Sequence, residues 1–389
     1  MGRVLISFLG KARGGEYDKL SYEFGPGDVE ETRYIGLALA RRVRPDRLVL
    51  LGTATSMWDV LLEHTDGQGE HAETWNLMND ELKTPQGVTQ SRLDPLAPVF
   101  TQHVGVPCVP RLIPLGRDAA EQVQILEVLA DAVEEQDQVS LDLTHGLRHL
   151  PMLGLLSALY LRRVKQVDIQ ALYYGAKEMR DAGAKETPVV RLDGLMQLAD
   201  WISALERYDH SGDYGVFQKL LPDGADTLEE AAFYERTNNA SQAKEKLGNF
   251  QRWLKENGST LSPAARLFRP QLEQRLELIK KPDRAAREAF LAWRYLERKD
   301  FLRAVIYGYE SLVTRQAVTL KKNPEGHDDR EEASRSLQDS TDFNTLKKMR
   351  NTLAHGLRNK DDDIAREVKS EATLDRRIKD LFKKLSLSR

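Results

Sequence analysis

Short apolar runs alternate with amphipathic stretches along the first half of the 389-residue chain. Runs rich in Val, Ile and Leu predict buried β-strands, and they cover residues 4–9, 47–52, 108–115, 138–144 and 167–175. Apolar residues at helical spacing lie between them and predict helices at 31–43, 56–64, 118–134 and 150–164. Strands that alternate with helices build a mainly parallel, doubly wound sheet, so we expect an α/β, Rossmann-like fold.

The second half of the chain has a different pattern. Strand-like runs stop after Asp193, and helical patterns rich in Glu, Lys, Gln and Leu follow. Helices are predicted at 284–298, 300–320, 342–355 and 365–385, with a polar loop from Lys321 to Ser340 that contains a short helix. We therefore expect three parts: an α/β domain at 1–192, an all-α connector at 193–283 and an α-helical domain at 284–389.

Composition narrows the class of protein. Hydrophobic residues make up 41% of the chain, and no run approaches the ~20 apolar residues that a membrane span needs. The first residues lack the pattern of a cleavable signal, and the single Cys108 cannot form an internal disulfide, so we expect a cytoplasmic protein without a membrane partner. From Lys281 to Arg389 there are 25 Lys and Arg against 19 Asp and Glu, which fits either a nucleic-acid partner or a solvated helical surface.

Polar and glycine residues follow four of the predicted strands. In doubly wound sheets, ligands bind beyond the carboxyl ends of the strands. Glycine allows a close backbone approach, and Ser and Thr hydroxyls suit phosphate or ribose, although the same residues are common in ordinary turns. The candidate ligand-binding residues in three of these loops are Gly10, Lys11, Thr53, Ser56, Met57, Trp58 and Gly175.

The fourth strand runs into the sequence DLTHGLRHLPM, residues 142–152. Its polar groups fit a metal site, a catalytic acid–base set or a loop that binds a polyanion. Pro151 favours a helix that starts near His149 or Leu150, which leaves His145 in the preceding loop and removes the helical spacing that two metal-binding histidines need. With one cysteine and no HExxH motif, we predict no metal site.

A polyanion site fits this loop better. A turn between a strand and a helix exposes backbone N–H groups from Thr144 through Gly146 to Arg148, and Arg148 adds a donor for phosphate. His145 and His149 can hydrogen-bond a base or ribose, whereas Asp142 can orient a histidine, cap the turn or accept from a ribose hydroxyl. The alternative is that these polar groups only stabilise the turn.

The motif Asp142-x-Thr144-His145-Gly146, followed by Arg148-His149-x-Pro151-Met152, resembles the signature of CRISPR-associated DxTHG-motif proteins, whose N-terminal domain is a CARF sensor. The loops at Leu9-Gly10 and Gly52 to Trp58 are similar to other pocket loops of these proteins. The resemblance implies a domain that dimerises and binds a ring of 3′,5′-linked adenylates, and we expect cyclic tetra-adenylate. Lys11-Ala12-Arg13 departs from the family, where smaller hydroxyl residues are expected.

A second cluster lies in the basic part of the chain, at residues 347–358. Asn351 and His355 are four residues apart and share a helical face, whereas Arg350 is rotated from His355 by about 140°. Gly356 is a natural helix stop, so we expect His355 in the last turn. A face-to-face pair of these helices in a dimer would bring two copies of Arg350 and His355 together. Such residues are also common near helix ends without a function.

Arg350-Asn351-x-x-x-His355 resembles the catalytic motif of HEPN ribonucleases, and residues 301–320 resemble an early HEPN helix in which Tyr309 and Glu310 either face the site or pack. A CARF sensor followed by a HEPN domain is the arrangement of CRISPR type III accessory ribonucleases. The resemblance implies that Arg350, Asn351 and His355 cleave single-stranded RNA without metal or cofactor, in a homodimer or higher even oligomer.

We therefore expect an antiviral endoribonuclease that a cyclic oligoadenylate activates. The main alternative is a nucleotide-sensing regulator that binds nucleic acid or protein through its helical part without cutting. A third reading is that the sensor also degrades its ring ligand, using Ser56, His145 or His149.

Overall fold

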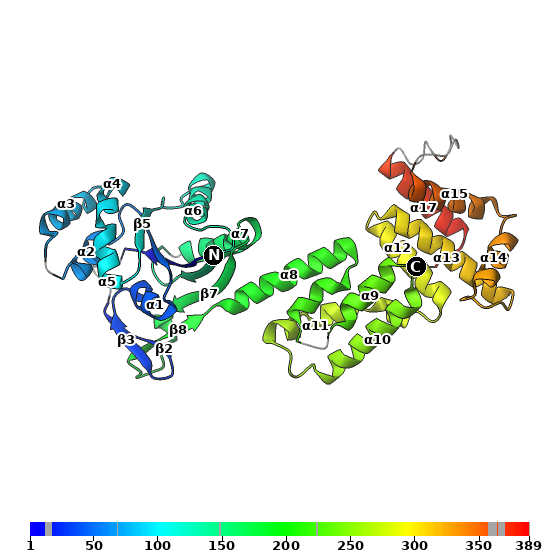
Figure 1. Ribbon diagram of the computed structural model, residues 1–389, viewed down its shortest axis with the longest axis horizontal. Helices are drawn as coiled ribbons and strands as arrows, with labels where there is room; N and C mark the ends of the chain where they lie inside the picture. The colour runs from blue at the N-terminus through cyan, green and yellow to red at the C-terminus, as the bar shows by residue number, and fades with distance from the viewer. Residues whose placement is uncertain are drawn as a thin grey trace. The chain divides into compact units, whose positions relative to one another are not determined.

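A computed structural model describes residues 1–11, 18–67, 69–147, 149–222, 225–356, 364 and 370–388. The chain forms two compact units, Met1–Met196 and Gln197–Arg389, which we call the N-terminal unit and the helical unit (Figure 1). The predicted order, an α/β domain followed by an all-α region, is confirmed.

Five parallel strands form one side of the eight-stranded sheet in the N-terminal unit. They are β1 (Arg3–Leu9), β4 (Arg47–Gly52), β5 (Cys108–Leu112), β6 (Gln138–Asp142) and β7 (Asp168–Gly175), in the spatial order β7-β6-β1-β4-β5. These are the five strands that the sequence predicts. From β1 the chain adds β4 and then β5 on one side, and afterwards it adds β6 and then β7 on the other side. The order in which strands are added therefore reverses between β1 and β6.

Three further strands extend the sheet beyond β7. They are β2 (Leu20–Gly25), β3 (Asp28–Thr32) and β8 (Glu186–Arg191); β8 runs antiparallel to β7, and β3 runs antiparallel to β2. None of these three strands is predicted from the sequence. The helix predicted to start at residue 31 is therefore corrected: α1 (Ile35–Val43) begins after β3.

Helices cover both faces of the sheet (Figure 1). On β1, Leu5 and Leu9 point into one core with α1, α2 (Trp58–Thr65) and α5 (Ala97–Val104). The alternate residue Ile6 points into the other core, with α6 (Ala119–Asp131) and α7 (Leu150–Val164). Successive side chains of a strand face opposite sides, so an unbroken apolar run is what a strand covered on both faces requires. Shorter elements complete this unit: α3 (Ala72–Leu82), α4 (Gln90–Leu93), η1 (Asp94–Leu96) and η2 (Lys177–Met179).

The helical unit is built around one hydrophobic core, which runs in sequence from Trp201 to Leu387. The predicted connector at 193–283 and the predicted domain at 284–389 both contribute to this core, so they form one compact unit here. Its elements are α8 (Asp193–Ser211), η3 (Tyr214–Leu220), α9 (Thr227–Arg236), α10 (Ala240–Glu256), α11 (Pro263–Arg275), η4 (Glu277–Lys280), α12 (Arg284–Glu297), α13 (Phe301–Thr319), α14 (His327–Ser336), α15 (Thr341–His355) and α17 (Glu371–Lys384).

Capping residues set where the last helices begin. The side chains of Asp283, Asp300 and Ser340 each accept a hydrogen bond from the backbone N–H three residues later, at the start of α12, α13 and α15. The short helix predicted within 321–340 is α14, and residues 365–369 of the last predicted helix lie outside the described residues. Among the described residues, no helix combines the length and apolar character needed to cross a membrane.

Candidate functional site

The reversal between β1 and β6 brings the predicted loops to one edge of the sheet. In parallel register, Leu9 lies opposite Gly52, Ser7 lies opposite Asp142, and Asp142 lies opposite Tyr173. The loops that follow these strands therefore start side by side. A switch point of this kind opens a crevice at the carboxyl ends of the strands, where ligands bind in such folds.

Asp142 and Thr144 stabilise the loop from within. The Asp142 carboxylate is fully buried and accepts hydrogen bonds from the Ser7 hydroxyl at 2.7 Å and from the Thr144 backbone N–H at 3.0 Å. The Thr144 hydroxyl accepts from the Gly175 backbone N–H at 2.8 Å. These contacts join β1, β6 and β7, so the predicted capping role of Asp142 fits the geometry.

Gly146 occupies a conformation that favours glycine. Its φ is +110°, and a Cβ atom there would lie 2.9 Å from Leu150 Cδ1. Gly146 is also exposed, so its backbone is open to an approaching ligand. Beside it, burial lowers the pKa of His145, while the charge of Asp142 and a hydrogen bond with the Arg33 backbone act in the opposite direction. The His145 imidazole is therefore neutral near pH 7.

His145 and His149 do not share a helical face. His149 lies at the N-cap of α7, with Nε2 2.7 Å from the Leu115 carbonyl oxygen, and His145 lies in the loop before it. This is the arrangement that Pro151 predicts. Within the described ranges, no group of three His, Cys, Asp or Glu side chains is placed to hold a metal ion. Arg148 lies outside the described residues.

The loop after β4 is held by its own hydroxyl groups. The Ser56 hydroxyl donates to the Leu9 carbonyl oxygen at 2.8 Å and accepts from the Thr53 N–H at 2.9 Å. The Trp58 indole donates to the Thr53 carbonyl oxygen at 2.9 Å, and the Met57 N–H donates to the Gly10 carbonyl oxygen at 3.0 Å. The four predicted ligand contacts in this loop, Thr53, Ser56, Met57 and Trp58, all have buried side chains, so their contact with a ligand stays a prediction. Lys11, next to Gly10, is exposed.

The second candidate site lies at the end of α15. Gly356, with a φ of +77°, follows the last helical residue, His355, and the predicted helix end is confirmed. His355 is exposed, whereas Arg350 and Asn351 are half-buried. The Arg350 guanidinium lies 4.2 Å from the centre of the Tyr309 ring and donates from Nε and Nη2 to Asn351 Oδ1 at 3.2 and 2.9 Å.

This geometry leaves one edge of Arg350 open. The hydrogen bonds to Asn351 use the Nε–Nη2 edge, and no carboxylate among the described residues pairs with the guanidinium. The Nη1–Nη2 edge has the spacing that binds two oxygens of a phosphate. An unpaired arginine edge can bind a phosphate, and an exposed imidazole can move a proton. Because Arg350 and His355 are rotated by about 140° from each other on α15, two copies of the helix would be needed to bring both groups to one phosphodiester.

Two comparisons with known proteins are informative. Residues 4–178 match the family model of the CARF domain of the CRISPR system endoribonuclease Csx1. The second match is a CRISPR-associated protein of Methanocaldococcus jannaschii, MJ1674, which is 25% identical over 316 residues that cover 73% of this chain. Together, the two matches support a relationship of this chain to the CRISPR-associated CARF family. The chain spans about half the length of that curated relative, 49%. CARF domains bind cyclic oligoadenylate signalling molecules, and from here we call the N-terminal unit the CARF-like unit.

Tyr22 lies near the motif at 142–152, and the sequence did not predict it. Tyr22, on β2, is 3% exposed, and a Cβ atom on Gly175 would lie 2.6 Å from its ring. Burial raises the pKa of Tyr22 to about 12, with a further contribution from the Asp142 charge. The signal that could have found this strand is the turn Gly25-Pro26-Gly27 between two short alternating runs, with Gly27 at a φ of +79°.

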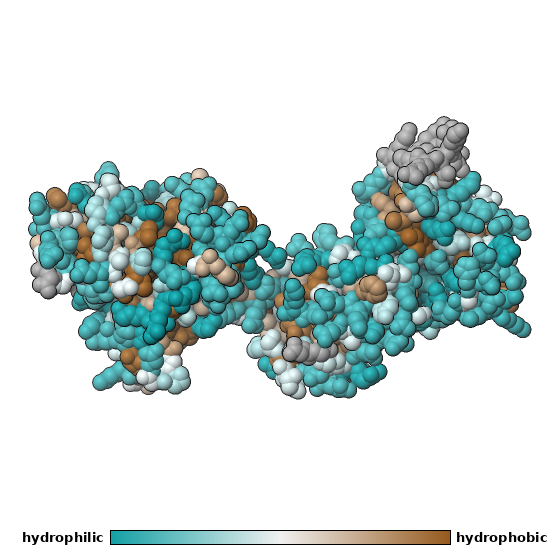
Figure 2. Space-filling model, viewed as in Figure 1, coloured by the Kyte–Doolittle hydropathy of each residue, from teal (hydrophilic) through white to brown (hydrophobic). Residues whose placement is uncertain are grey.

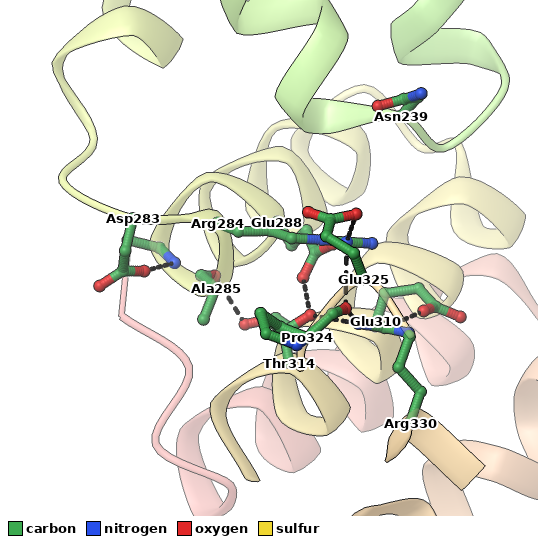
Figure 3. Close-up of polar contacts among 12 residues, drawn as sticks. Asn239, Asp283, Arg284, Ala285, Glu288, Glu310, Thr314, Pro324, Glu325 and Arg330 are labelled. Atoms are coloured by element: carbon green, nitrogen blue, oxygen red, sulfur yellow. Dashed lines mark hydrogen bonds and ion pairs between the residues drawn. The ribbon is translucent and has the colours of Figure 1, made fainter. Parts of the chain in front are cut away.

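Tyr309 and Glu310 of the helical unit differ in their surroundings. Tyr309 lies beneath Arg350, whereas Glu310 forms an ion pair with Arg330 of α14 (Figure 3). Arg330 also donates to the Thr314 hydroxyl at 2.9 Å and to the Pro324 carbonyl oxygen at 2.7 Å. Tyr309 is therefore the member of the pair that contacts the candidate site.

Proposed function

We propose that this protein is an endoribonuclease of type III CRISPR defence that a cyclic oligoadenylate activates and that cuts single-stranded RNA without a metal ion. One observation carries the nuclease part of the proposal. Near the end of α15, Asn351 accepts from the Nε–Nη2 edge of Arg350, the Nη1–Nη2 edge has no partner among the described residues, and His355 is exposed one turn beyond Asn351. The CARF match at residues 4–178 supports the sensing part.

The proposed reaction needs only groups of this chain and the RNA. His355 takes the proton from a ribose 2′-hydroxyl, and the 2′-oxygen attacks the adjacent phosphorus. The bond to the 5′-oxygen of the next nucleotide breaks, and that oxygen takes a proton from the second His355 of a dimer. Arg350 binds the non-bridging oxygens as negative charge builds on them. The products are a 2′,3′-cyclic phosphate and a 5′-hydroxyl.

In the sensor, we propose that the backbone around Gly146 and the Lys11 side chain contact the phosphates of the ring. Gly146 is exposed at the carboxyl edge of the sheet, and Lys11 follows the neighbouring strand β1. The predicted contribution of Arg148 belongs to the same loop. We propose cyclic tetra-adenylate as the ligand.

An apolar stripe on α7 supports a dimer of CARF-like units. Met152, Leu156, Tyr160 and Val164 are 70, 56, 39 and 56% exposed, and their spacing of four residues aligns them on one face. Figure 2 shows hydrophobic residues, in brown, at several places on a mainly hydrophilic surface. The stripe starts at Met152, the last residue of the motif at 142–152, so a two-fold pairing of α7 would bring two motif loops together.

The dimer has its own test. Met152→Glu combined with Leu156→Glu is expected to halve the molar mass measured by light scattering and to abolish activation by the ring. Val123→Glu on α6 is the matched control, because Val123 is also 56% exposed but lies outside the stripe. A double variant with wild-type mass and activity would contradict the α7 interface.

Activation requires that the ring binds the active arrangement more tightly than the inactive one. The decisive experiment is RNA cleavage by the full chain in EDTA, with cyclic tetra-adenylate or cyclic hexa-adenylate. We expect one ring to stimulate cleavage and the products to carry cyclic phosphates. Ring binding without any cleavage would instead indicate a non-catalytic regulator, and loss of cleavage in EDTA would contradict the metal-free mechanism.

A further inference from the structure

Arg350 is held by an aromatic contact that no motif of the sequence describes. Its guanidinium carbon lies 4.2 Å from the centre of the Tyr309 ring, and Phe343 stacks on Tyr309 with ring centres 5.4 Å apart and planes 23° apart. Phe343 and Arg350 lie seven residues apart on α15 and so lie close to one face of that helix. Two side chains of α15 therefore contact a single ring of α13.

The Tyr309 ring is itself fixed at its hydroxyl end. The hydroxyls of Tyr309 and Ser334 are 2.7 Å apart, and each residue is 8% exposed. A buried tyrosine hydroxyl with a partner has one preferred orientation, because losing that partner would leave a polar group unsatisfied. Ser334 belongs to α14, so this helix sets the height and tilt of the ring under Arg350.

The same helix holds the residue next to Tyr309. Arg330 of α14 pairs with Glu310, and it also bonds Thr314 and the Pro324 carbonyl (Figure 3). Thr314 donates in turn to Glu288 at 2.7 Å, whose carboxylate is almost fully buried. Two consecutive residues of α13 therefore contact α14: Tyr309 through Ser334, and Glu310 through Arg330.

We propose that Tyr309 is a positioning residue for Arg350, and that α14 holds Tyr309 in place through Ser334. The proposal rests on the proposed ribonuclease function. The ring attracts the face of the guanidinium, while Asn351 accepts from its Nε–Nη2 edge, and the two contacts leave the Nη1–Nη2 edge without a partner among the described residues. Removing the ring would let Arg350 rotate away from the phosphate on which charge develops.

The first experiment compares Tyr309→Met with Tyr309→Phe in the full chain, activated by the ring. Methionine fills similar space without a π face, so kcat should fall about tenfold, and the affinity for RNA should fall as well, because Arg350 contacts the phosphate of the bound RNA. Phenylalanine keeps the π face and loses only the contact with Ser334, so its loss should stay within about threefold. Ser334→Ala should match Tyr309→Phe, and the two changes together should cost no more than either alone.

Tyr295→Phe is a matched control for packing. Tyr295 also carries a guanidinium, that of Arg303 at 4.4 Å, and its hydroxyl donates to the buried Glu235 at 2.6 Å. This substitution should lower the melting temperature without changing kcat per folded molecule. Tyr309→Met with wild-type kcat would overturn the proposal.

A second measurement separates positioning from general destabilisation. In a His355→Ala chain, which binds RNA without cutting it, the affinity for a short RNA is measured with Tyr309→Met, Arg350→Ala and both. If Tyr309 acts through Arg350, the tyrosine change weakens binding when Arg350 is present and has no effect when it is absent. Equal losses in both backgrounds would overturn the proposal. If the wild-type chain cuts no RNA with any ring, the ribonuclease function itself fails.

Discussion

The two candidate sites use their polar side chains in opposite ways. In the CARF-like unit, Asp142, Thr144 and Ser56 form hydrogen bonds within the protein: Asp142 with the Ser7 hydroxyl and its own loop, and Thr144 and Ser56 with the backbone of neighbouring strands. At the end of α15, Arg350 keeps an open edge and His355 is exposed. Polar residues in a motif can therefore stabilise the shape of a site instead of contacting its ligand. The hydrogen-bond partners of each residue distinguish these two roles.

The largest expected effect tests the open site. His355→Ala should reduce RNA cleavage at least about 10²- to 10⁴-fold, because the proton acceptor for the 2′-hydroxyl is lost. Ring binding and the free energy of unfolding should be unchanged, since the side chain is exposed. His327→Ala is the control, because His327 is also exposed but lies in α14. Cleavage that survives His355→Ala, measured with labelled RNA, would remove this histidine from the mechanism.

The next effect tests the internally bonded site. Asp142→Ala leaves the Ser7 hydroxyl and the Thr144 N–H without their buried acceptor, so the CARF-like unit should lose about 2–4 kcal/mol in its free energy of unfolding. Urea unfolding followed by fluorescence measures this loss, and calorimetry should show weaker ring binding. A stable Asp142→Ala protein that fails only to bind the ring would reverse our comparison, because Asp142 would then contact the ligand directly.

The smallest effect concerns the pH dependence of stability. The pKa of His145 is lowered in the folded chain, mainly by burial, so the unfolded chain takes up this proton first as the pH falls below 6.5. His145 therefore contributes stability above pH 6.5 that is lost towards lower pH. His145→Gln should show a shallower loss between pH 7.5 and 5 in urea titrations. An unchanged slope would mean that His145 is as solvated as an ordinary surface histidine.

The sequence predicted what depends on periodicity and on single strong signals. All five parallel strands, the helices of the last part and the stop at Gly356 follow from apolar spacing, capping residues and glycine. Pro151 correctly separated His145 from His149. These features are local, so a short window of sequence contains their cause.

What the sequence could not predict depends on long-range contacts. Strands β2, β3 and β8 are short and partly exposed, so their weak alternation gives little signal until they pair with β7 and with each other. Tyr22 reaches the CARF motif only through that pairing. Tyr309 and Arg350 are forty-one positions apart, and nothing in either segment predicts that one lies under the other. The RNxxxH spacing identified Arg350, Asn351 and His355 as candidates, but it did not predict that the Tyr309 ring contacts Arg350.

The shared core of the helical unit has a practical consequence for engineering. A fragment cut at Arg284, where the terminal helices begin, would leave behind Trp201, Phe217 and Phe250, which pack in the same core as Tyr295 and Tyr307. In such a fragment, the hydrophobic side chains that pack against the missing helices would be exposed to solvent, and we expect it to aggregate. A version of the helical unit that is fused to another protein should therefore begin at Asp193, where α8 starts, so that every helix of the shared core stays in one piece.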